Sequence, residues 1–134
     1  MAHFKNTYLG DLRTESIHIK SGTRIITDAP TDNHGKGEAF SPTDLVCAAL
    51  ASCKMTIMGI LANREGIDLQ GLSCEIEKVM ATNPRRISEI KITFSLPNSQ
   101  LTEKQRTMLI NAANTCPVAL SLHPDLKRTV VYNF

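Results

Sequence analysis

A nearly uninterrupted apolar stretch, SPTDLVCAALASCKMTIMGILAN at residues 41–63, constrains the fold of this chain more than any other segment. Its first residues predict a helix start, because Ser41 can cap the helix, Pro42 suits the first turn and Asp44 occupies the capping-box position. Over residues 45–62, 14 of the 18 side chains are apolar, and the polar ones form no continuous stripe. A helix that is apolar on almost every side must be buried on almost every side.

A membrane and a second protein subunit are the two environments that could bury such a helix. The stretch has about the length of a membrane span, roughly 20 residues. Lys54 lies near its centre, however, where a lysine costs about 2.5–3.5 kcal/mol on insertion scales. We therefore expect no membrane association. A chain of this size has difficulty covering one helix on every side, so we expect a homodimer.

The composition narrows the class of protein. With 134 residues the chain fits a single domain, 1–134. Fifteen basic and 13 acidic residues give a net charge of +2, which is too balanced to indicate nucleic-acid binding. The first 20 residues lack the apolar core of a signal peptide, so a cytoplasmic location is expected. Four cysteines without a close CxxC pair suggest free or redox-active thiols rather than a secreted disulfide framework.

The remaining pattern predicts strands, helix, hairpin, helices and strand, which is an α+β order. In the hairpin, alternating apolar residues mark the buried face of two antiparallel strands. These apolar residues are Leu72, Cys74, Ile76 and Met80 in the first strand, and Ile90, Ile92, Phe94 and Leu96 in the second. The other expected elements are strands within residues 5–28, a polar loop at 30–41, a capped helix from Thr102 to about Asn114, a short helix starting at Cys116-Pro117, and a strand at 128–134.

Arg13 is a candidate functional cation in the first strands. If the period of two holds from Leu9, Arg13 points to the same side as Ile17 and Ile19. This arrangement would direct a guanidinium inward, unless a bulge changes the period.

The four cysteines differ in their sequence context. Cys47 and Cys53 are about 9 Å apart along one helix and roughly 120° apart around it, so they cannot form a disulfide with each other. Cys47 and Cys74 fit small buried hydrophobic positions. Cys116 occupies an expected helix N-cap, where N–H groups and the dipole lower a thiol pKa. Cys53 lies mid-helix and would need a cation from elsewhere, for which Arg13 is a candidate.

Two other kinds of site are not indicated. The cysteines and His3, His18, His34 and His123 show no short spacing of the zinc type, so no metal is expected. A serine-hydrolase G-x-S-x-G motif is absent.

The two segments SPTDLVCAALASC and NTCPVALSL together resemble the OsmC/Ohr family, the osmotically inducible and organic-hydroperoxide-resistance proteins. The pairing is specific: a proline lies eleven residues before a mid-helix cysteine, and a second cysteine precedes Pro-Val. The resemblance covers essentially the whole chain. It implies an OsmC-like fold in which antiparallel sheets wrap two long central helices of an intertwined homodimer.

The resemblance also implies a thiol peroxidase that reduces organic hydroperoxides. Carried over by motif, Cys53 would be the peroxidatic thiolate and Cys116 the resolving cysteine, which together form a disulfide through a sulfenic acid. Arg13 would match the family's arginine and hold the thiolate. No bound cofactor is implied; an external dithiol, such as a lipoyl group, would restore the thiols.

One position departs from the family pattern. The peroxidases place a glutamate directly after the proline, where this chain has Thr43. Glu38 and Asp44 are the alternative carboxylates that could orient Arg13, and Asp44 could instead serve only as the helix cap. Thr43 and Lys54 favour a second hypothesis, a catalytically weak dimer that binds a small apolar ligand at the subunit interface. Lys54 itself could lower the pKa of Cys53 or extend its ammonium to the surface.

Overall fold

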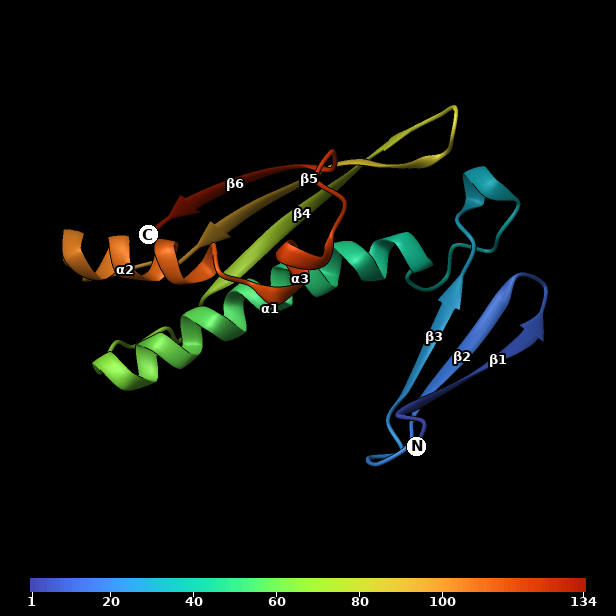
Figure 1. Ribbon diagram of the computed structural model, residues 1–134, viewed down its shortest axis with the longest axis horizontal. Helices are drawn as coiled ribbons and strands as arrows, with labels where there is room; N and C mark the ends of the chain where they lie inside the picture. Colours follow the sequence, from blue (N-terminus) through green and yellow to red (C-terminus); the bar gives the residue numbers. More distant parts are fainter. The chain divides into compact units, whose positions relative to one another are not determined.

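The structure is a computed structural model that describes residues 1–134. It contains two three-stranded sheets and three α-helices, in the order strands, helix, hairpin, helices and strand (Figure 1). The α+β class predicted from the sequence is therefore confirmed. The chain forms two compact units, residues 1–46 and 47–134.

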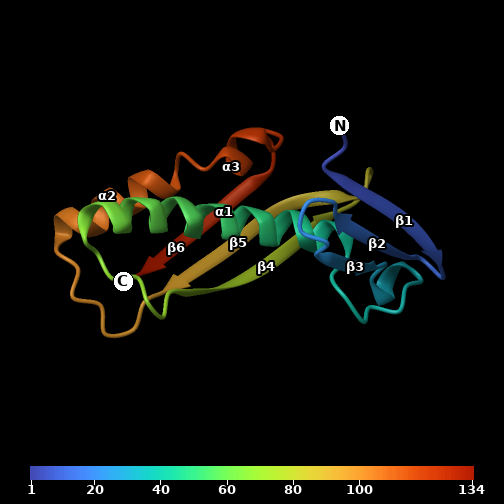
Figure 2. The same cartoon turned by 90° about the horizontal axis from the view of Figure 1, so that it is seen from below.

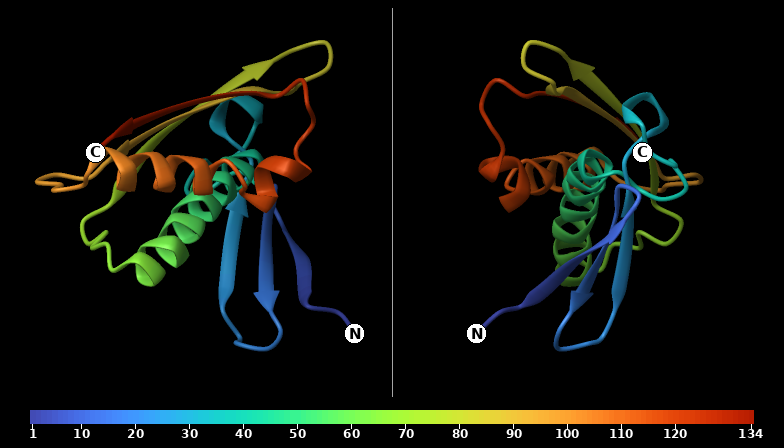
Figure 3. Two further views of the ribbon diagram at one scale, coloured as in Figure 1. Left: turned by 60° about the vertical axis from the view of Figure 1, so that its left-hand side comes forward. Right: turned by 90° about the vertical axis from the view of Figure 1, so that its right-hand side faces the viewer.

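The first unit is built on an antiparallel sheet with the strand order β1-β2-β3 (Figure 3). Its strands are β1 (Phe4–Gly10), β2 (Arg13–His18) and β3 (Arg24–Asp28), and a short 3-10 helix, η1 (Thr31–Asn33), follows. The register of β1 against β2 shifts between Tyr8 and Gly10, which places a bulge in β1 opposite the start of β2 at Arg13. In the β2–β3 register Arg13 lies directly opposite Asp28. This pairing positions the arginine site described below.

The apolar stretch forms the long helix α1 (Pro42–Glu65). Its start has the predicted capping box: the Asp44 N–H donates to the Ser41 hydroxyl over 3.1 Å, and the Ser41 N–H donates to the Asp44 carboxylate over 2.9 Å. By length and a mean hydropathy of 1.9 the helix could span a membrane, but it buries one stripe in the protein core. This stripe comprises Cys47, Leu50, Ala51, Lys54, Met58, Leu61 and Ala62.

Burial of α1 is one-sided within a single chain. Its buried positions recur at intervals of three and four, which is the spacing of one helix face. On the other side, Ile60 is 58% exposed. The expectation that α1 is covered all round is therefore not met by one chain, and the homodimer remains a prediction that would cover this face.

The second unit contains a mixed sheet with the strand order β4-β5-β6 (Figure 2). Its strands are β4 (Ser73–Ala81), β5 (Arg86–Ser95) and β6 (Lys127–Asn133). The predicted β4–β5 antiparallel hairpin is confirmed, while β6 pairs with β5 in parallel, an exception to the expected antiparallel sheets. Ile90, Ile92 and Phe94 are fully buried as predicted, whereas Ile76 is exposed in the single chain.

Two further helices lie with α1 on one face of this sheet (Figures 1 and 2). Helix α2 (Glu103–Ala113) has the predicted capping box between Thr102 and Gln105. Helix α3 (Pro117–Ser121) starts after Cys116 at its N-cap, also as predicted. The core between helices and sheet therefore encloses Cys116 completely.

Candidate functional site

The structure brings together two cysteines that are 63 positions apart in the sequence. Cys53 comes from the middle of α1, and Cys116 from the junction between α2 and α3. Their thiols lie within hydrogen-bonding reach of each other, and neither forms a disulfide. Cys53 is half-buried while Cys116 is 0% exposed. The arrangement supplies one thiol that solvent can reach and a second, protected thiol beside it.

The environment of Cys116 corrects a prediction made from its N-cap position. Its Sγ does accept a hydrogen bond from the Ala119 N–H, over 3.5 Å, as an N-cap should. Burial nevertheless raises the pKa of Cys116, and the neighbouring Cys53 thiol raises it further, while the Ala119 N–H lowers it. The cost of desolvating a thiolate outweighs the two helix-terminal N–H groups, of Val118 and Ala119, that lower the pKa. The expected net lowering of this pKa is therefore wrong for the isolated chain.

Lys54, which follows Cys53 in the sequence, is buried rather than extended to the surface. The residue is 4% exposed, and its Nζ donates to the Ala113 carbonyl over 3.2 Å. Burial lowers the pKa of Lys54, whereas the charge of a Cys116 thiolate raises it and the Arg128 guanidinium lowers it. Two cations and two thiols thus share the same part of the core.

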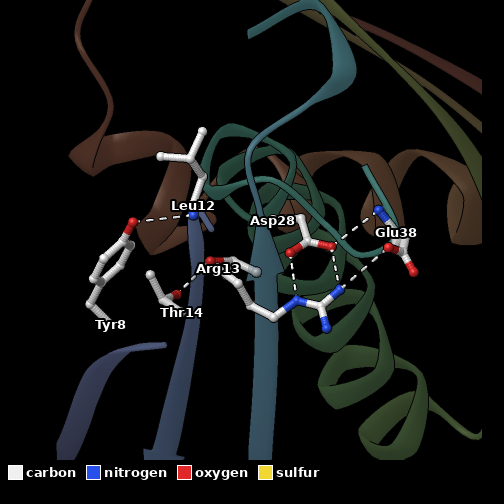
Figure 4. Close-up of polar contacts among 7 residues, drawn as sticks. Tyr8, Leu12, Arg13, Thr14, Asp28 and Glu38 are labelled. Atoms are coloured by element: carbon white, nitrogen blue, oxygen red, sulfur yellow. Dashed lines mark hydrogen bonds and ion pairs between the residues drawn. The ribbon is translucent and has the colours of Figure 1, made fainter. Parts of the chain in front are cut away.

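Arg13 forms a second cluster, in the first unit (Figure 4). Its guanidinium donates a bidentate pair of hydrogen bonds to the Asp28 carboxylate, from Nε to Oδ1 over 2.7 Å and from Nη2 to Oδ2 over 2.8 Å. Asp28 is 0% exposed and also accepts the Glu38 N–H over 3.1 Å. The hydrogen bond from Arg13 lowers the pKa of Asp28, against the opposing effect of burial. The guanidinium is therefore held rigidly by a carboxylate that stays ionised.

The carboxylate that orients Arg13 differs from the two predicted from the sequence. Glu38 lies 4.0 Å from Arg13 Nη2 and its side chain is 67% exposed, so its part is secondary. Asp44 serves in the helix cap, as its alternative interpretation held. Asp28 was missed. The signal existed in the strand register: a hairpin turn centred between Lys20 and Ser21 places residue 28 opposite residue 13.

The other cysteines and the metal-binding potential can be described briefly. Cys47 is buried and Cys74 is half-buried against the core, and burial raises the pKa of Cys74. Both positions agree with the expectation of small core residues. No three His, Cys, Asp or Glu side chains lie close enough together to hold a metal ion.

Comparisons with known proteins assign the chain to a family. A model of the family described as "OsmC-like protein" matches residues 35–130. A candidate osmotic stress induced and detoxification response protein from Psychrobacter arcticus 273-4 is 52% identical, with a TM-score of 0.95 over 99% of this chain and 96% of the other. No curated protein matches the chain.

More distant solved structures share the fold. An organic hydroperoxide resistance protein, OsmC, from Legionella pneumophila superposes with a TM-score of 0.76 at 16% identity, over 100% of this chain and 98% of the other. An OsmC like protein from Mycoplasma pneumoniae superposes with a TM-score of 0.80 at 20% identity, over 97% and 94%. Together with the family match, these similarities show that the chain belongs to the OsmC-like protein family.

Proposed function

We propose that this protein is a thiol-dependent peroxidase that reduces organic hydroperoxides. The Cys53 thiolate attacks the O–O bond, takes one oxygen as a sulfenic acid and releases the alcohol after the alkoxide gains a proton. The Cys116 sulfur then forms an S–S bond with Cys53, and the sulfenic oxygen leaves as water. An external dithiol, such as a lipoyl group, reduces the disulfide and restores both thiols.

One observation carries this proposal: the Cys53 and Cys116 thiols lie within hydrogen-bonding reach although they come from distant segments. The partial exposure of Cys53 supports its role as the thiol that meets a hydroperoxide, and the burial of Cys116 next to it supports a resolving role. The family membership and the organic hydroperoxide resistance protein among the solved structures of this fold support the same redox chemistry.

We further propose that the protein acts as a homodimer and that Arg13 assists the peroxidatic thiolate. The exposed face of α1 supports the homodimer, since it presents Ile60 to solvent in the single chain. The family resemblance supports the second role, and within the first unit Asp28 holds the Arg13 guanidinium in a fixed orientation. A cation beside a thiolate favours its ionised form, and it can polarise the departing oxygen.

The test is consumption of cumene hydroperoxide with a dithiol reductant by the wild type, Cys53→Ser and Cys116→Ser. We expect the wild type to lose two thiols per subunit when one equivalent of hydroperoxide is added without reductant. Cys53→Ser should lose all activity, and Cys116→Ser should accumulate a sulfenic acid that dimedone traps. Cys74→Ser is the matched control and should retain activity, because Cys74 packs against the core on β4.

Absence of turnover in well-folded wild-type protein would refute the peroxidase proposal. The chain would then fit the second hypothesis, a catalytically weak dimer that binds a small apolar ligand. The two hypotheses also differ in thiol counting, because a binding protein keeps all four thiols after addition of hydroperoxide.

A further inference from the structure

Lys54 is an unusual residue in the core of the second unit. It lies on the buried stripe of α1, between Leu50 and Met58, which are four positions away on either side and fully buried. It is the only charged residue in that stripe. A buried ammonium is costly unless an opposite charge or hydrogen bonds compensate for its lost hydration.

The contacts of Lys54 link it to Cys116 through a shared acceptor. Lys54 Nζ donates to the Ala113 carbonyl over 3.2 Å, and the same oxygen accepts the Cys116 N–H over 3.3 Å. Ala113 is the last residue of α2, where helix carbonyls carry partial negative charge. The ammonium is therefore fixed at the turn that carries Cys116. Adjacent residues on a helix point about 100° apart, so proximity in sequence does not aim Lys54 at Cys53.

No carboxylate is among the groups whose charge shifts the pKa of Lys54. The charged and titratable groups acting on it are Cys116 at the α2–α3 junction, Arg128 on β6 and Cys53 on α1, with Cys116 the stronger of the two thiols. Arg128 donates from Nη2 to the His123 carbonyl, and its buried Nε has no partner. On β6, burial raises the pKa of Tyr132 and the charge of a Cys116 thiolate raises it further, and the buried Tyr132 hydroxyl has no partner. Burial disfavours the charged forms of both Lys54 and Cys116, and the two thiols are the groups beside Lys54 that can carry a negative charge.

We propose that the Lys54 ammonium is the counter-ion of the Cys116 thiolate and controls the resolving step of the thiol cycle. This inference rests on the proposed function. In that step the electron pair of the Cys116 thiolate forms the S–S bond, and the S–O bond of the Cys53 sulfenic acid breaks. The oxygen leaves as hydroxide and takes a proton from solvent. Lys54 acts through Cys116, as a residue that sets how much of this thiol is ionised.

The size of the effect follows from the loss of one neighbouring charge. Removing an opposite charge within about 4–6 Å raises a thiol pKa by about one unit or more, which lowers the thiolate fraction at neutral pH about tenfold. The nucleophilicity of a thiolate also rises about threefold for each unit by which its pKa is raised. Lys54→Met should therefore slow resolution about threefold at pH 7 and make it faster above the pKa of the thiol. A role in folding alone would produce no such crossing of the pH profiles.

The experiment separates the two steps by stopped-flow kinetics with cumene hydroperoxide, in wild type, Lys54→Met, Lys54→Arg and the surface control Lys91→Met. We expect Lys54→Met to change sulfenic acid formation less than twofold and to shift the pH profile of disulfide formation upward by about one unit. Lys54→Arg should restore the wild-type profile because it keeps the charge. Lys91→Met should match wild type, since Lys91 is a partly exposed residue that pairs with Glu77.

A second measurement needs no peroxidase turnover. Cysteine labelled with carbon-13 at Cβ reports the titration of each thiol by NMR. The Cys53→Ser background removes the neighbouring thiol, and comparison with Cys53→Ser/Cys116→Ser assigns the Cys116 signal among those of Cys47 and Cys74. Lys54→Met should raise the Cys116 midpoint by about one unit in that background, and an unchanged midpoint would overturn the inference. Failure of the proposed function would look different: wild-type protein would then form no sulfenic acid, whatever the residue at position 54.

Discussion

Formation of the Cys53–Cys116 disulfide should stabilise the protein by an amount that the structure allows us to calculate. The two cysteines are 63 positions apart in the sequence. In the chain-entropy model, closing a loop of that length lowers the entropy of the unfolded state enough to contribute about 4 kcal/mol at 25 °C. Because the thiols already lie within hydrogen-bonding reach in the reduced protein, little native-state distortion should offset this gain.

Urea denaturation measures this gain directly. With an m-value of about 2 kcal/mol/M, the urea midpoint of the oxidised protein should exceed that of the reduced protein by about 2 M. Both forms should be compared at equal protein concentration, because a dimer's stability depends on it. Mass spectrometry must show that Cys47 and Cys74 remain reduced. Cys116→Ser treated with the same hydroperoxide is the control and should show no such increase.

An equal or lower midpoint for protein that has lost two thiols would refute this reasoning. It would mean that the two sulfurs bond only after a rearrangement whose strain cancels the entropic gain. The contact between Cys53 and Cys116 would then not represent the geometry of the resolving step.

Three further predictions follow from particular contacts. Asp28→Asn should lower peroxidase activity at least tenfold because it releases Arg13. Glu38→Gln should change activity less than about twofold, since surface ion pairs contribute little. Steady-state kinetics distinguishes the two variants, with circular dichroism as a check of folding. Burial lowers the pKa of Lys54, so between that lowered pKa and about 10.4 the unfolded state binds more protons than the folded state. The free energy of unfolding should therefore rise with pH across this window in protein that lacks both site cysteines, and Lys54→Met in the same background should lack this rise. Ile60→Glu should shift sedimentation toward monomer if a second subunit covers α1, and an unchanged dimer would place the interface elsewhere.

The ionisation of Asp28 also makes a pH prediction for the first unit, with a definite sign. Its pKa is lowered in the folded state by Arg13, so its contribution to stability is present above the unfolded value of about 4. That contribution is lost as the pH falls through the folded pKa. Denaturation followed by circular dichroism at decreasing pH should show a loss of stability below about pH 4 that Asp28→Asn lacks.

Several elements of the fold could be predicted from residues that are close in the sequence. The Ser41–Asp44 and Thr102–Gln105 capping boxes involve residues only three positions apart, so the sequence pattern nearly specifies the contacts. The strict alternation in β5 likewise predicts its buried face. The direction of β6 was not predicted, because parallel pairing depends on how the intervening helices return the chain to the sheet.

The candidate site shows the same division between contacts of residues close in the sequence and contacts of distant segments. The sequence by itself determined the long apolar helix, the N-cap position of Cys116 and, through two motifs, the cysteine pair. Only the tertiary structure decided that Asp28 holds Arg13, that Lys54 is buried beside Cys116, and that burial raises the pKa of that thiol. Caps and periodicity depend on neighbours within one turn or strand, whereas ion pairing, desolvation and thiol contact depend on segments that meet only when the chain folds.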